Sequence, residues 1–281
     1  MTLRAVVWNL YLGGVDGASE ERLKQQAEIL LGLNADIVCL PECNRWEEGG
    51  ERRLCWMAHT LGLQPVAMVR SRLGTPPVQN HTTLLYRPSA LRLLDKAVLG
   101  RDAFHHALIR ARFRPVEEHD DRRDFLVLAT HLSWRNGRTR LDEATWVTDY
   151  GGKFPGMPPR GILLADLNVP DREPPDSDWS LIPQNMHARY RKIREDGSFG
   201  DVDQDALQLL LNSGWQDPQT LTGVQRAPTV GYAYPDEPVE WCLDYALVHG
   251  LAVTSYRTHD TPQARKASDH LPVVADVEVR S

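Results

Sequence analysis

Short apolar runs that stop at a polar residue recur along this chain, and they constrain its fold more than any other feature. Such runs occupy residues 4–12, 35–43, 125–134, 161–170 and 242–250. Strands that are apolar on both sides are typical of sheets buried between other layers, whereas strict alternation would leave one face in water. Some of the segments between the apolar runs are short enough for hairpins, and others are long enough for crossover connections. The sequence therefore predicts two packed, mixed β-sheets with helices outside, an α/β (α+β) fold.

Helical patterns fill several of the longer gaps between the runs. The clearest covers residues 19–33, where Ser19 can cap the helix and Leu23, Ala27 and Leu30 fall on one face. Further helices are expected near residues 51–61, 139–150 and 203–214, and the runs at residues 81–88 and 90–99 look like paired strands. Because no linker, repeat or composition break divides the chain, residues 1–281 are expected to form a single domain.

The composition is that of a globular protein with an acidic balance. The chain has 281 residues, 42% of them hydrophobic, and a formal net charge of −6. An acidic total does not exclude nucleic acid, because an enzyme can contact phosphate locally. No apolar stretch reaches the roughly 18–20 residues that cross a bilayer, and the first residues lack the pattern of a signal peptide. We therefore expect a cytoplasmic protein without a membrane partner, and the sequence carries no signal of its oligomeric state.

The run that begins at residue 161 ends in Asp166, Leu167 and Asn168. Burying a carboxylate and an amide is costly unless both are paired, so their position needs an explanation. Strand alternation would put Asp166 and Asn168 on the same side. The carboxylate could orient or deprotonate a water molecule while the amide donates to a phosphoryl oxygen. The alternative is an Asp–Asn turn that only ends the strand.

Two more polar residues interrupt apolar runs near the start of the chain. Glu42 follows the second run, where a carboxylate is a suitable hard ligand for Mg²⁺ or Mn²⁺. Taken alone, it is more typical of a solvated loop residue. Asn9 lies inside the expected first strand, either as a functional group or as a satisfied amide at a sheet edge.

Two histidines and two aspartates complete the set. His131 ends an apolar run and could contact a phosphate oxygen or a leaving group, although a lone histidine is more often structural. Ser268, Asp269 and His270 place a carboxylate beside an imidazole just before another run. Asp244 lies within an apolar run and needs a partner, for which His270 is the obvious candidate, because a carboxylate behind a histidine fixes its tautomer and raises its basicity. Together these junctions indicate a metal-dependent enzyme that cuts phosphate esters.

In this order the motifs N, PE, TH, DxN, LDY and SDH resemble the endonuclease/exonuclease/phosphatase superfamily, which includes pancreatic-type deoxyribonucleases and abasic-site endonucleases. The resemblance runs from Asn9 to His270 and so covers nearly the whole chain. It implies a four-layer α/β sandwich with the site at one end of two sheets. Ala165 stands where the family usually has glycine, and Pro41 where glutamine or leucine is usual. Neither change removes a reacting residue.

The resemblance also implies a role for each residue. Glu42 would be the principal Mg²⁺ (or Mn²⁺) ligand, with Asn9 and Asp269 assisting at or near the metal. The catalytic residues would be Asp166, which aligns or deprotonates water; Asn168, which stabilises charge on the phosphate; His270, which contacts the phosphate with Asp244 behind it; and His131, which stabilises the phosphate or protonates the leaving oxygen.

Arginines near these motifs favour a nucleic-acid substrate. Arg135 and Arg138 follow His131, and Arg191 lies in a basic stretch, residues 189–194, in which Tyr190 offers a ring for stacking. We therefore expect a nuclease or a related phosphodiesterase. The alternatives are an enzyme that acts on a small-molecule or lipid head-group phosphate, and a non-catalytic binding module. The basic stretch could also be a solvated helix face.

Overall fold

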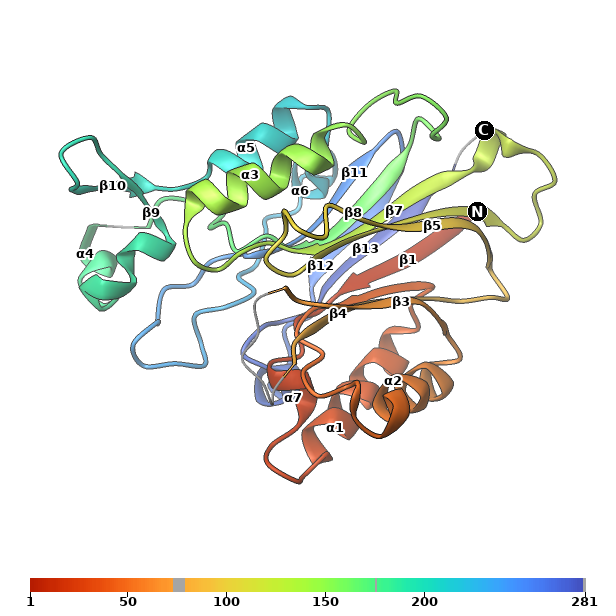
Figure 1. Ribbon diagram of the computed structural model, residues 1–281, viewed down its shortest axis with the longest axis horizontal. Coiled ribbons are helices and arrows are strands. Elements are labelled where there is room, and N and C mark those ends of the chain that lie inside the picture. The colour runs from red at the N-terminus through yellow and green to blue at the C-terminus, as the bar shows by residue number, and fades with distance from the viewer. Residues whose placement is uncertain (73–78, 175, 280–281) are drawn as a thin grey trace.

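Two mixed β-sheets lie face to face between two layers of helices (Figure 1). The computed structural model describes residues 1–72, 79–174 and 176–279. The six-stranded sheet has the order β12 (Ala252–Thr258), β13 (Val273–Glu278), β1 (Thr2–Val7), β2 (Ile37–Leu40), β4 (His81–Tyr86), β3 (Gln64–Arg70). The five-stranded sheet has the order β11 (Asp244–His249), β8 (Gly161–Asp166), β7 (Phe125–His131), β6 (Ala107–Pro115), β5 (Leu91–Leu99). The predicted sandwich of two packed sheets flanked by helices is confirmed.

Each sheet contains one parallel pair of strands, β1 with β2 and β7 with β8. A parallel pair needs a crossover connection, and a helix supplies it in both sheets, α1 (Glu21–Leu33) and α3 (Gly137–Thr148). The cap of α3 is Asn136, whose side chain accepts a hydrogen bond from Thr139 N at 2.9 Å.

Strand alternation sends successive side chains into different cores. In β1, Leu3, Ala5 and Val7 pack between the two sheets, while Val6 faces the helices. The strand β8 divides its side chains between two cores in the same way. Both faces of these central strands are therefore buried, which is why the runs are apolar throughout rather than alternating.

Helices cover the outer face of each sheet. The six-stranded sheet carries α1, α2 (Glu48–Leu61) and α7 (Pro262–Ala267), and the five-stranded sheet carries α3 and α5 (Asp205–Asn212). A short helix, α6 (Pro218–Thr222), lies against β11 and β12. In the part of the chain that the structure describes, no helix combines the length and apolar character needed to cross a membrane.

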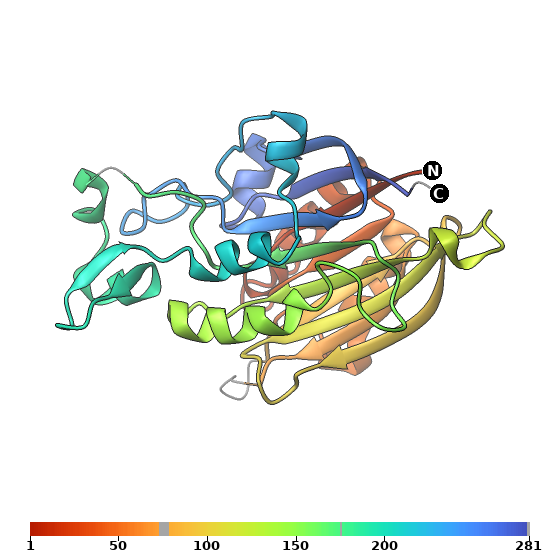
Figure 2. The same cartoon turned by 90° about the horizontal axis from the view of Figure 1, so that it is seen from above.

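A smaller segment projects from one end of the sandwich (Figure 2). It contains α4 (Asp176–Trp179), a 3-10 helix (Gln184–Arg189) and the antiparallel strands β9 (Arg191–Ile193) and β10 (Phe199–Val202). Trp179 and Tyr190 of this segment pack with Trp241, which precedes β11, in a separate small apolar cluster.

Two local expectations from the sequence are wrong. The first strand ends at Val7 instead of continuing to residue 12, because Tyr11 and Leu12 have positive φ angles that turn the chain. The strands β4 and β5, expected to pair with each other, belong to different sheets. β4 pairs instead with β2 and β3, and β5 pairs with β6, the next strand along the chain.

Candidate active site

Three of the predicted residues lie side by side at one end of the five-stranded sheet. His131 ends β7, Asp166 ends β8 and Asp244 begins β11, and the register pairs His131 with Asp166 and Asp166 with Asp244. Residues in register on neighbouring strands project from the same face of a sheet. Here that face meets the other sheet, because Ala129 and Leu164, two residues earlier on β7 and β8, pack between the sheets. All three side chains are buried.

Asn9 reaches this group from the six-stranded sheet. Its Nδ2 donates a hydrogen bond to Asp166 Oδ2 at 2.9 Å, and Tyr11 N donates to its Oδ1 at 3.0 Å. Ser268 Oγ donates to the backbone oxygen of Asn9 at 2.7 Å. The amide is therefore held at both ends, and it connects the ends of the two sheets.

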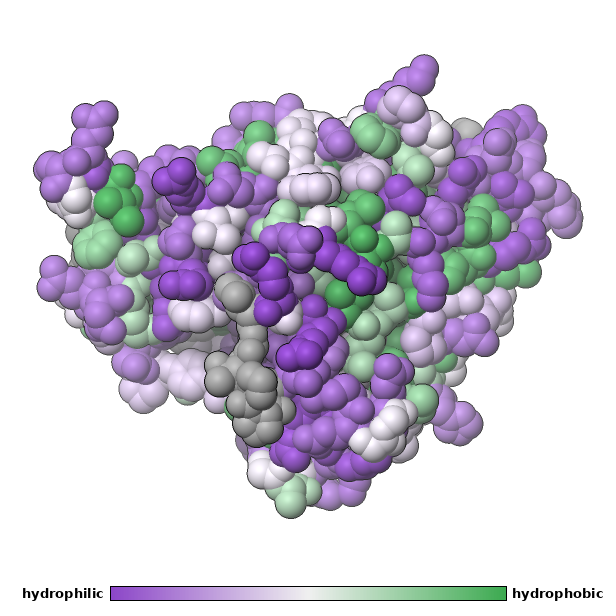
Figure 3. All heavy atoms as spheres, viewed as in Figure 1, coloured by the Kyte–Doolittle hydropathy of each residue, from purple (hydrophilic) through white to green (hydrophobic). Residues whose placement is uncertain are grey.

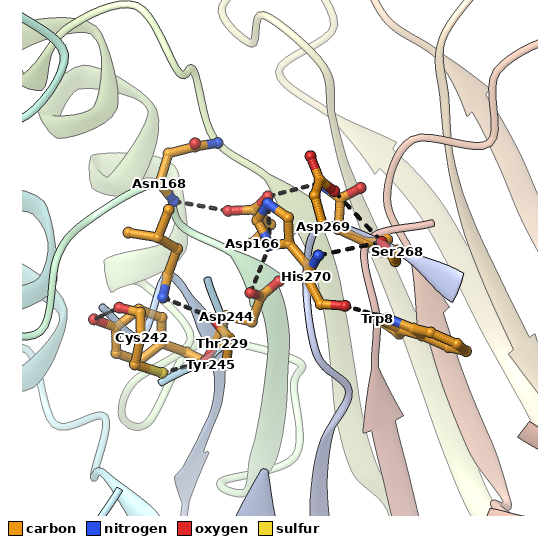
Figure 4. A network of polar contacts seen from close by, with 12 residues as sticks. Trp8, Asp166, Asn168, Thr229, Cys242, Asp244, Tyr245, Ser268, Asp269 and His270 are labelled. Atoms are coloured by element: carbon orange, nitrogen blue, oxygen red, sulfur yellow. Dashed lines mark hydrogen bonds and ion pairs between the residues drawn. The ribbon is translucent and has the colours of Figure 1, made fainter. Parts of the chain in front are cut away.

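His270 completes the cluster (Figure 4). Its Nδ1 lies 2.8 Å from Asp244 Oδ2 and 4.0 Å from Asp166 Oδ2. Its backbone is fixed on both sides, because Trp8 Nε1 donates to His270 O at 2.8 Å and His270 N donates to Ser268 Oγ at 3.2 Å. Since Asp244 occupies Nδ1, Nε2 is the ring nitrogen that remains for a ligand. The expected partnership of Asp244 with His270 is present in the structure.

The charges of this cluster depend on one another. Burial disfavours the charged ring of His270, but Asp244 and Asp166 outweigh burial and hold the pKa of His270 well above its usual value. Burial also raises the pKa of Asp166 and of Asp244, although the charge of His270 opposes it. The arrangement therefore keeps a proton on His270 at neutral pH, between two buried carboxylates.

Glu42 and Asp269 form a second acidic group, beside the first. Glu42 has a φ angle of 58°, in the left-handed region that costs a residue with a Cβ roughly 1–2 kcal/mol. Its Oε2 accepts a hydrogen bond from Leu12 N at 3.3 Å, and Asp269 Oδ2 accepts one from Tyr234 OH at 3.0 Å. Burial, and then the negative charge of Asp269, raise the pKa of Glu42 to about 7. This unusual backbone therefore holds Glu42 where another carboxylate repels it.

These carboxylates fit a divalent cation. A cation would relieve the repulsion between Glu42 and Asp269, and carboxylate oxygens are the ligands that Mg²⁺ and Mn²⁺ favour. Among the described residues, the ligand atoms of Asp166, Asp244 and His270 also lie within 4.8 Å of one another. In that group, however, Nδ1 of His270 faces Asp244 at 2.8 Å. This arrangement suits a histidine that holds or transfers a proton better than one that binds a metal ion through Nδ1.

His131 is part of a stack of three histidines. Its ring lies parallel to that of His106, with centroids 3.7 Å apart, and His106 stacks on His105 with centroids 4.5 Å apart. His131 Nε2 is 3.5 Å from Asp166 Oδ2. Burial, followed by the charge of His270, lowers the pKa of His131 to about 3. A neutral His131 can donate a hydrogen bond from its single ring N–H to a phosphate or a leaving group. At neutral pH it lacks the second ring proton that a general acid would transfer.

Asn168 is not on the continuation of β8, contrary to the alternation argument. Its φ angle is 52°, and its backbone N donates to Asp166 Oδ1 at 2.9 Å, which forms a turn. One amide N–H of Asn168 is used by Leu132 O, 3.0 Å from Nδ2. The amide has a second N–H, so it can still donate to a ligand.

A family model described as the Endonuclease/Exonuclease/phosphatase family matches residues 6–270 of this sequence. The chain belongs to this family. A search of curated protein sequences finds no match. The match of the family model, together with the two packed sheets, gives the chain the phosphoesterase fold of the Endonuclease/Exonuclease/phosphatase family.

Solved structures share this fold at low sequence identity. An endonuclease/exonuclease/phosphatase from Bacteroides vulgatus is 16% identical with a TM-score of 0.68, over 100% of both chains. The human Nocturnin catalytic domain with bound sulfate is 17% identical with a TM-score of 0.62, over 99% of this chain and 95% of that one. ANGEL2, described as a 2′,3′-cyclic phosphatase in complex with adenosine-2′,3′-vanadate, is 14% identical with a TM-score of 0.66, over 98% and 95%.

In this family member a cavity of about 230 Å³ opens beside the acidic groups. Asn168, Asp269 and His270 line one side of it. Aromatic side chains line much of the rest, namely Trp134, Tyr190, Tyr234 and Trp241. Sequence reasoning proposed Tyr190 as a stacking ring, but Tyr234 and Trp241 come from a stretch without a motif, so no pattern in the sequence marked them.

Glu143 is a second residue that the motifs did not reveal. It is fully buried on α3, and its two oxygens accept hydrogen bonds from His105 N at 2.6 Å and Ser133 N at 2.7 Å. It therefore anchors both the start of the histidine stack and the loop that follows His131. The only sequence signal is an acidic residue on the apolar face of a predicted helix.

The predicted substrate-binding arginines do not share one environment. Arg135 and Arg138 are exposed around the start of α3. Arg191 packs over the ring of Trp179 at 4.6 Å and donates to Gly200 O at 2.6 Å, so it stabilises the projecting segment. Its neighbours in the basic stretch are also paired: Arg189 with Glu237 at 3.0 Å and Lys192 with Asp205 at 2.6 Å. Most charges in this stretch thus have partners within the fold.

Proposed function

We propose that this chain is a divalent-metal-dependent phosphodiesterase that cleaves nucleic acid. One observation carries the proposal: His270, whose Nδ1 lies 2.8 Å from Asp244, shares its site with a carboxylate, Asp166, that is fixed at both oxygens. Beside them lie Glu42 and Asp269, two carboxylates that could hold a divalent cation. Phosphoester hydrolysis requires these parts, an oriented water, positive charge for the phosphoryl oxygens and help for the leaving oxygen.

The charge and the hydrogen bonds of each residue indicate its role in hydrolysis. Asp166 cannot rotate, because Asn168 N and Asn9 Nδ2 hold its two oxygens, so it suits the orientation of an attacking water. His270 offers a positive N–H to a phosphoryl oxygen, and Asn168 offers its second amide N–H. The neutral His131 adds a donor near the leaving oxygen. When bound by Glu42 and Asp269 with Asn9 nearby, Mg²⁺ or Mn²⁺ would supply Lewis-acid charge neutralisation.

Nucleic acid is the substrate that we favour, because the cavity beside His270 can bind a base. The cavity that begins at His270 is lined by aromatic rings, and base–aromatic stacking stabilises a bound strand by about 1–3 kcal/mol per base. Arg135 and Arg138 are exposed close to His131 in the chain and are free to meet a phosphate backbone. ANGEL2 was solved with an adenosine derivative, which supports a nucleoside phosphate as the substrate class.

A small phosphoester is the second candidate. The basic stretch that would have marked a long backbone contact is mostly paired within the fold. The cavity, at about 230 Å³, lies below the roughly 300–1,000 Å³ typical of drug-sized ligand sites, so it would hold one ring system.

Incubation with Mg²⁺ or Mn²⁺ and three kinds of substrate separates these possibilities. Cleavage of plasmid DNA or RNA oligomers that EDTA abolishes supports the proposal, whereas release of phosphate from small phosphomonoesters alone supports the second candidate. Inactivity on all of them would point to a binding module. Asp166→Asn and His270→Ala should each abolish most of the activity, and the exposed Asp260→Asn serves as the matched control. Full activity of both site variants would overturn the assignment.

A further inference from the structure

A second groove, with other lining residues than the cavity at His270, lies between the edges of the two sheets. It has a volume of about 760 Å³ and is formed by β3 of one sheet and by β5 and β6 of the other. Its floor is aliphatic, with Val66, Val98 and Ile109 among the lining residues. In the view of Figure 1, Figure 3 shows apolar side chains gathered between β5 and β3, with strongly hydrophilic side chains beside them. Lys96 Nζ spans the groove and donates to Val66 O at 2.6 Å.

The rim of this groove is positively charged although the protein is acidic. The described residues that line the groove include Arg70, Arg72, Lys96 and Arg101, and no aspartate or glutamate. All four cations are exposed, and no salt bridge joins the three arginines to a described carboxylate. Asp95, the neighbour of Lys96, forms an ion pair with Arg110 at 2.7 Å instead. Four uncompensated cations on a chain of net charge −6 indicate a local site for a polyanion.

The groove ends next to the proposed reaction site. His106 lines the groove, and its ring stacks at 3.7 Å on that of His131, which lies 3.5 Å from Asp166. On the other side, Arg70 pairs in register with His81, whose backbone oxygen accepts a hydrogen bond from Cys43 N, the residue after Glu42. The groove and the site thus lie at the same end of the two sheets.

We propose that this groove binds a single strand of nucleic acid that leads away from the scissile phosphate. The inference rests on the proposed function and extends it, because it makes a polymer, and not a nucleotide or another small phosphoester, the substrate. The four cations that line the groove can meet the phosphates of a backbone, and the aliphatic floor accepts the faces of sugars and bases. The walls belong to two sheets, and a hydrogen bond of 2.6 Å from Lys96 Nζ on β5 to Val66 O on β3 joins them, so the groove exists before the strand arrives.

Binding without turnover tests the groove separately from catalysis. A fluorescent 15-nucleotide single strand is titrated with the full chain in EDTA, at several salt concentrations, and anisotropy gives the affinity. Four phosphate contacts predict a log–log slope of about −2.8, which is about a 50-fold loss of affinity between 50 and 200 mM salt. The variant Arg70→Glu/Arg72→Glu/Arg101→Glu should bind at least tenfold more weakly and lose only about threefold over that range. The matched control, Arg92→Glu/Lys153→Glu/Lys266→Glu, changes the net charge equally at exposed positions outside the groove.

Hydrolysis of bis(p-nitrophenyl) phosphate, which is too small to fill the groove, completes the test. We expect the groove variant to keep kcat/KM for this compound within twofold of the unmodified protein, and to lose at least tenfold in kcat/KM for the 15-nucleotide strand. If the two triple variants behave alike, the groove is not the binding site, even when hydrolysis proves the proposed function. If the unmodified protein binds the strand with the expected slope but hydrolyses nothing, the groove stands and the proposed function fails. Self-association in place of strand binding, seen by sedimentation, would assign the groove to a second copy and overturn the inference.

Discussion

Asp244 Oδ2 and His270 Nδ1 lie 2.8 Å apart, and this contact sets both the orientation and the charge of the histidine. Asp244 begins a strand of one sheet, whereas His270 precedes a strand of the other. The pair therefore exists only because the two sheets pack with their ends aligned. Most of the chemistry proposed above depends on this alignment.

Asp244→Asn should keep the shape of the site but remove the charge behind His270. We expect kcat to fall by roughly 10²–10⁴-fold, the range associated with an acid–base group or its orienting carboxylate. The pKa of His270 is held high partly by Asp244, so its loss should move the alkaline decline of activity to lower pH. A pH–rate profile checks both effects, with Asp260→Asn as the control. An unchanged profile would contradict the pairing.

Metal affinity should depend on pH through Glu42. The pKa of Glu42 is raised to about 7, so the metal-free protein holds a proton there at lower pH, and a cation must displace it. Below pH 7 the Kd for Mg²⁺ should therefore rise up to tenfold per pH unit, and it should level off above pH 8. Calorimetry at pH 6, 7 and 8 in buffers of different ionisation enthalpy gives the affinity and the protons released. A Kd that does not change with pH would exclude Glu42 as the ligand.

Saturation with metal should stabilise the fold. At 100 times Kd a ligand that binds only the folded state adds about 2.7 kcal/mol, so Tm should rise by several degrees in Mg²⁺ or Mn²⁺ and return on addition of EDTA. Glu42→Gln should abolish the rise. Glu47→Gln, which changes a nearby carboxyl group outside the site, should retain it.

His131 should stay neutral throughout the physiological pH range. The pKa of His131 is lowered to about 3 by burial and by the charge of His270. A positive charge on His131 would also disfavour its stacking on His106. The ¹⁵N signals of the His131 ring should therefore not shift between pH 5 and 8. Titration of His131 near pH 6.5 would show that the stack is open in solution.

Glu143→Gln should destabilise the protein without touching the site directly. Its carboxylate accepts two backbone N–H bonds, and a glutamine amide can accept only one of them, so the other donor is left buried and unpaired. Such a loss costs about 1–3 kcal/mol, which corresponds to a fall in Tm of about 2–4 °C for each kcal/mol in a chain of this size class. The neighbouring exposed Asp142→Asn is the control in thermal unfolding. An equal Tm for both variants would mean that the two hydrogen bonds contribute nothing.

Local chemistry made part of this protein predictable. The apolar runs predicted buried strands, because a strand that is apolar on both sides must be covered on both faces. The polar ends of those runs predicted Asp166 and Asp244, because a buried carboxylate needs a partner. The two residues that the sequence treated separately, Asn9 and Asp166, are joined by a hydrogen bond across 157 positions, and no local pattern contains that contact.

Charge was less predictable than position. The basic stretch around Arg191 resembled a nucleic-acid contact, but Glu237 and Asp205, which lie outside the stretch, pair with two of its cations. The cations of the groove, in contrast, are scattered from Arg70 to Arg101 and form no run in the sequence. Whether a cation is available to a ligand depends on its neighbours in space, which the order of residues does not state.

The sequence by itself determined the sandwich and the family and supplied the candidate site residues, because each of these follows from patterns within a few positions. The tertiary structure alone decided which of those residues touch, which protonation states they hold and where free positive charge lies. The reason is physical: hydrophobic burial and alternation act locally along the chain, whereas desolvation, Coulomb interaction and register act between segments that only the packing of the two sheets brings together.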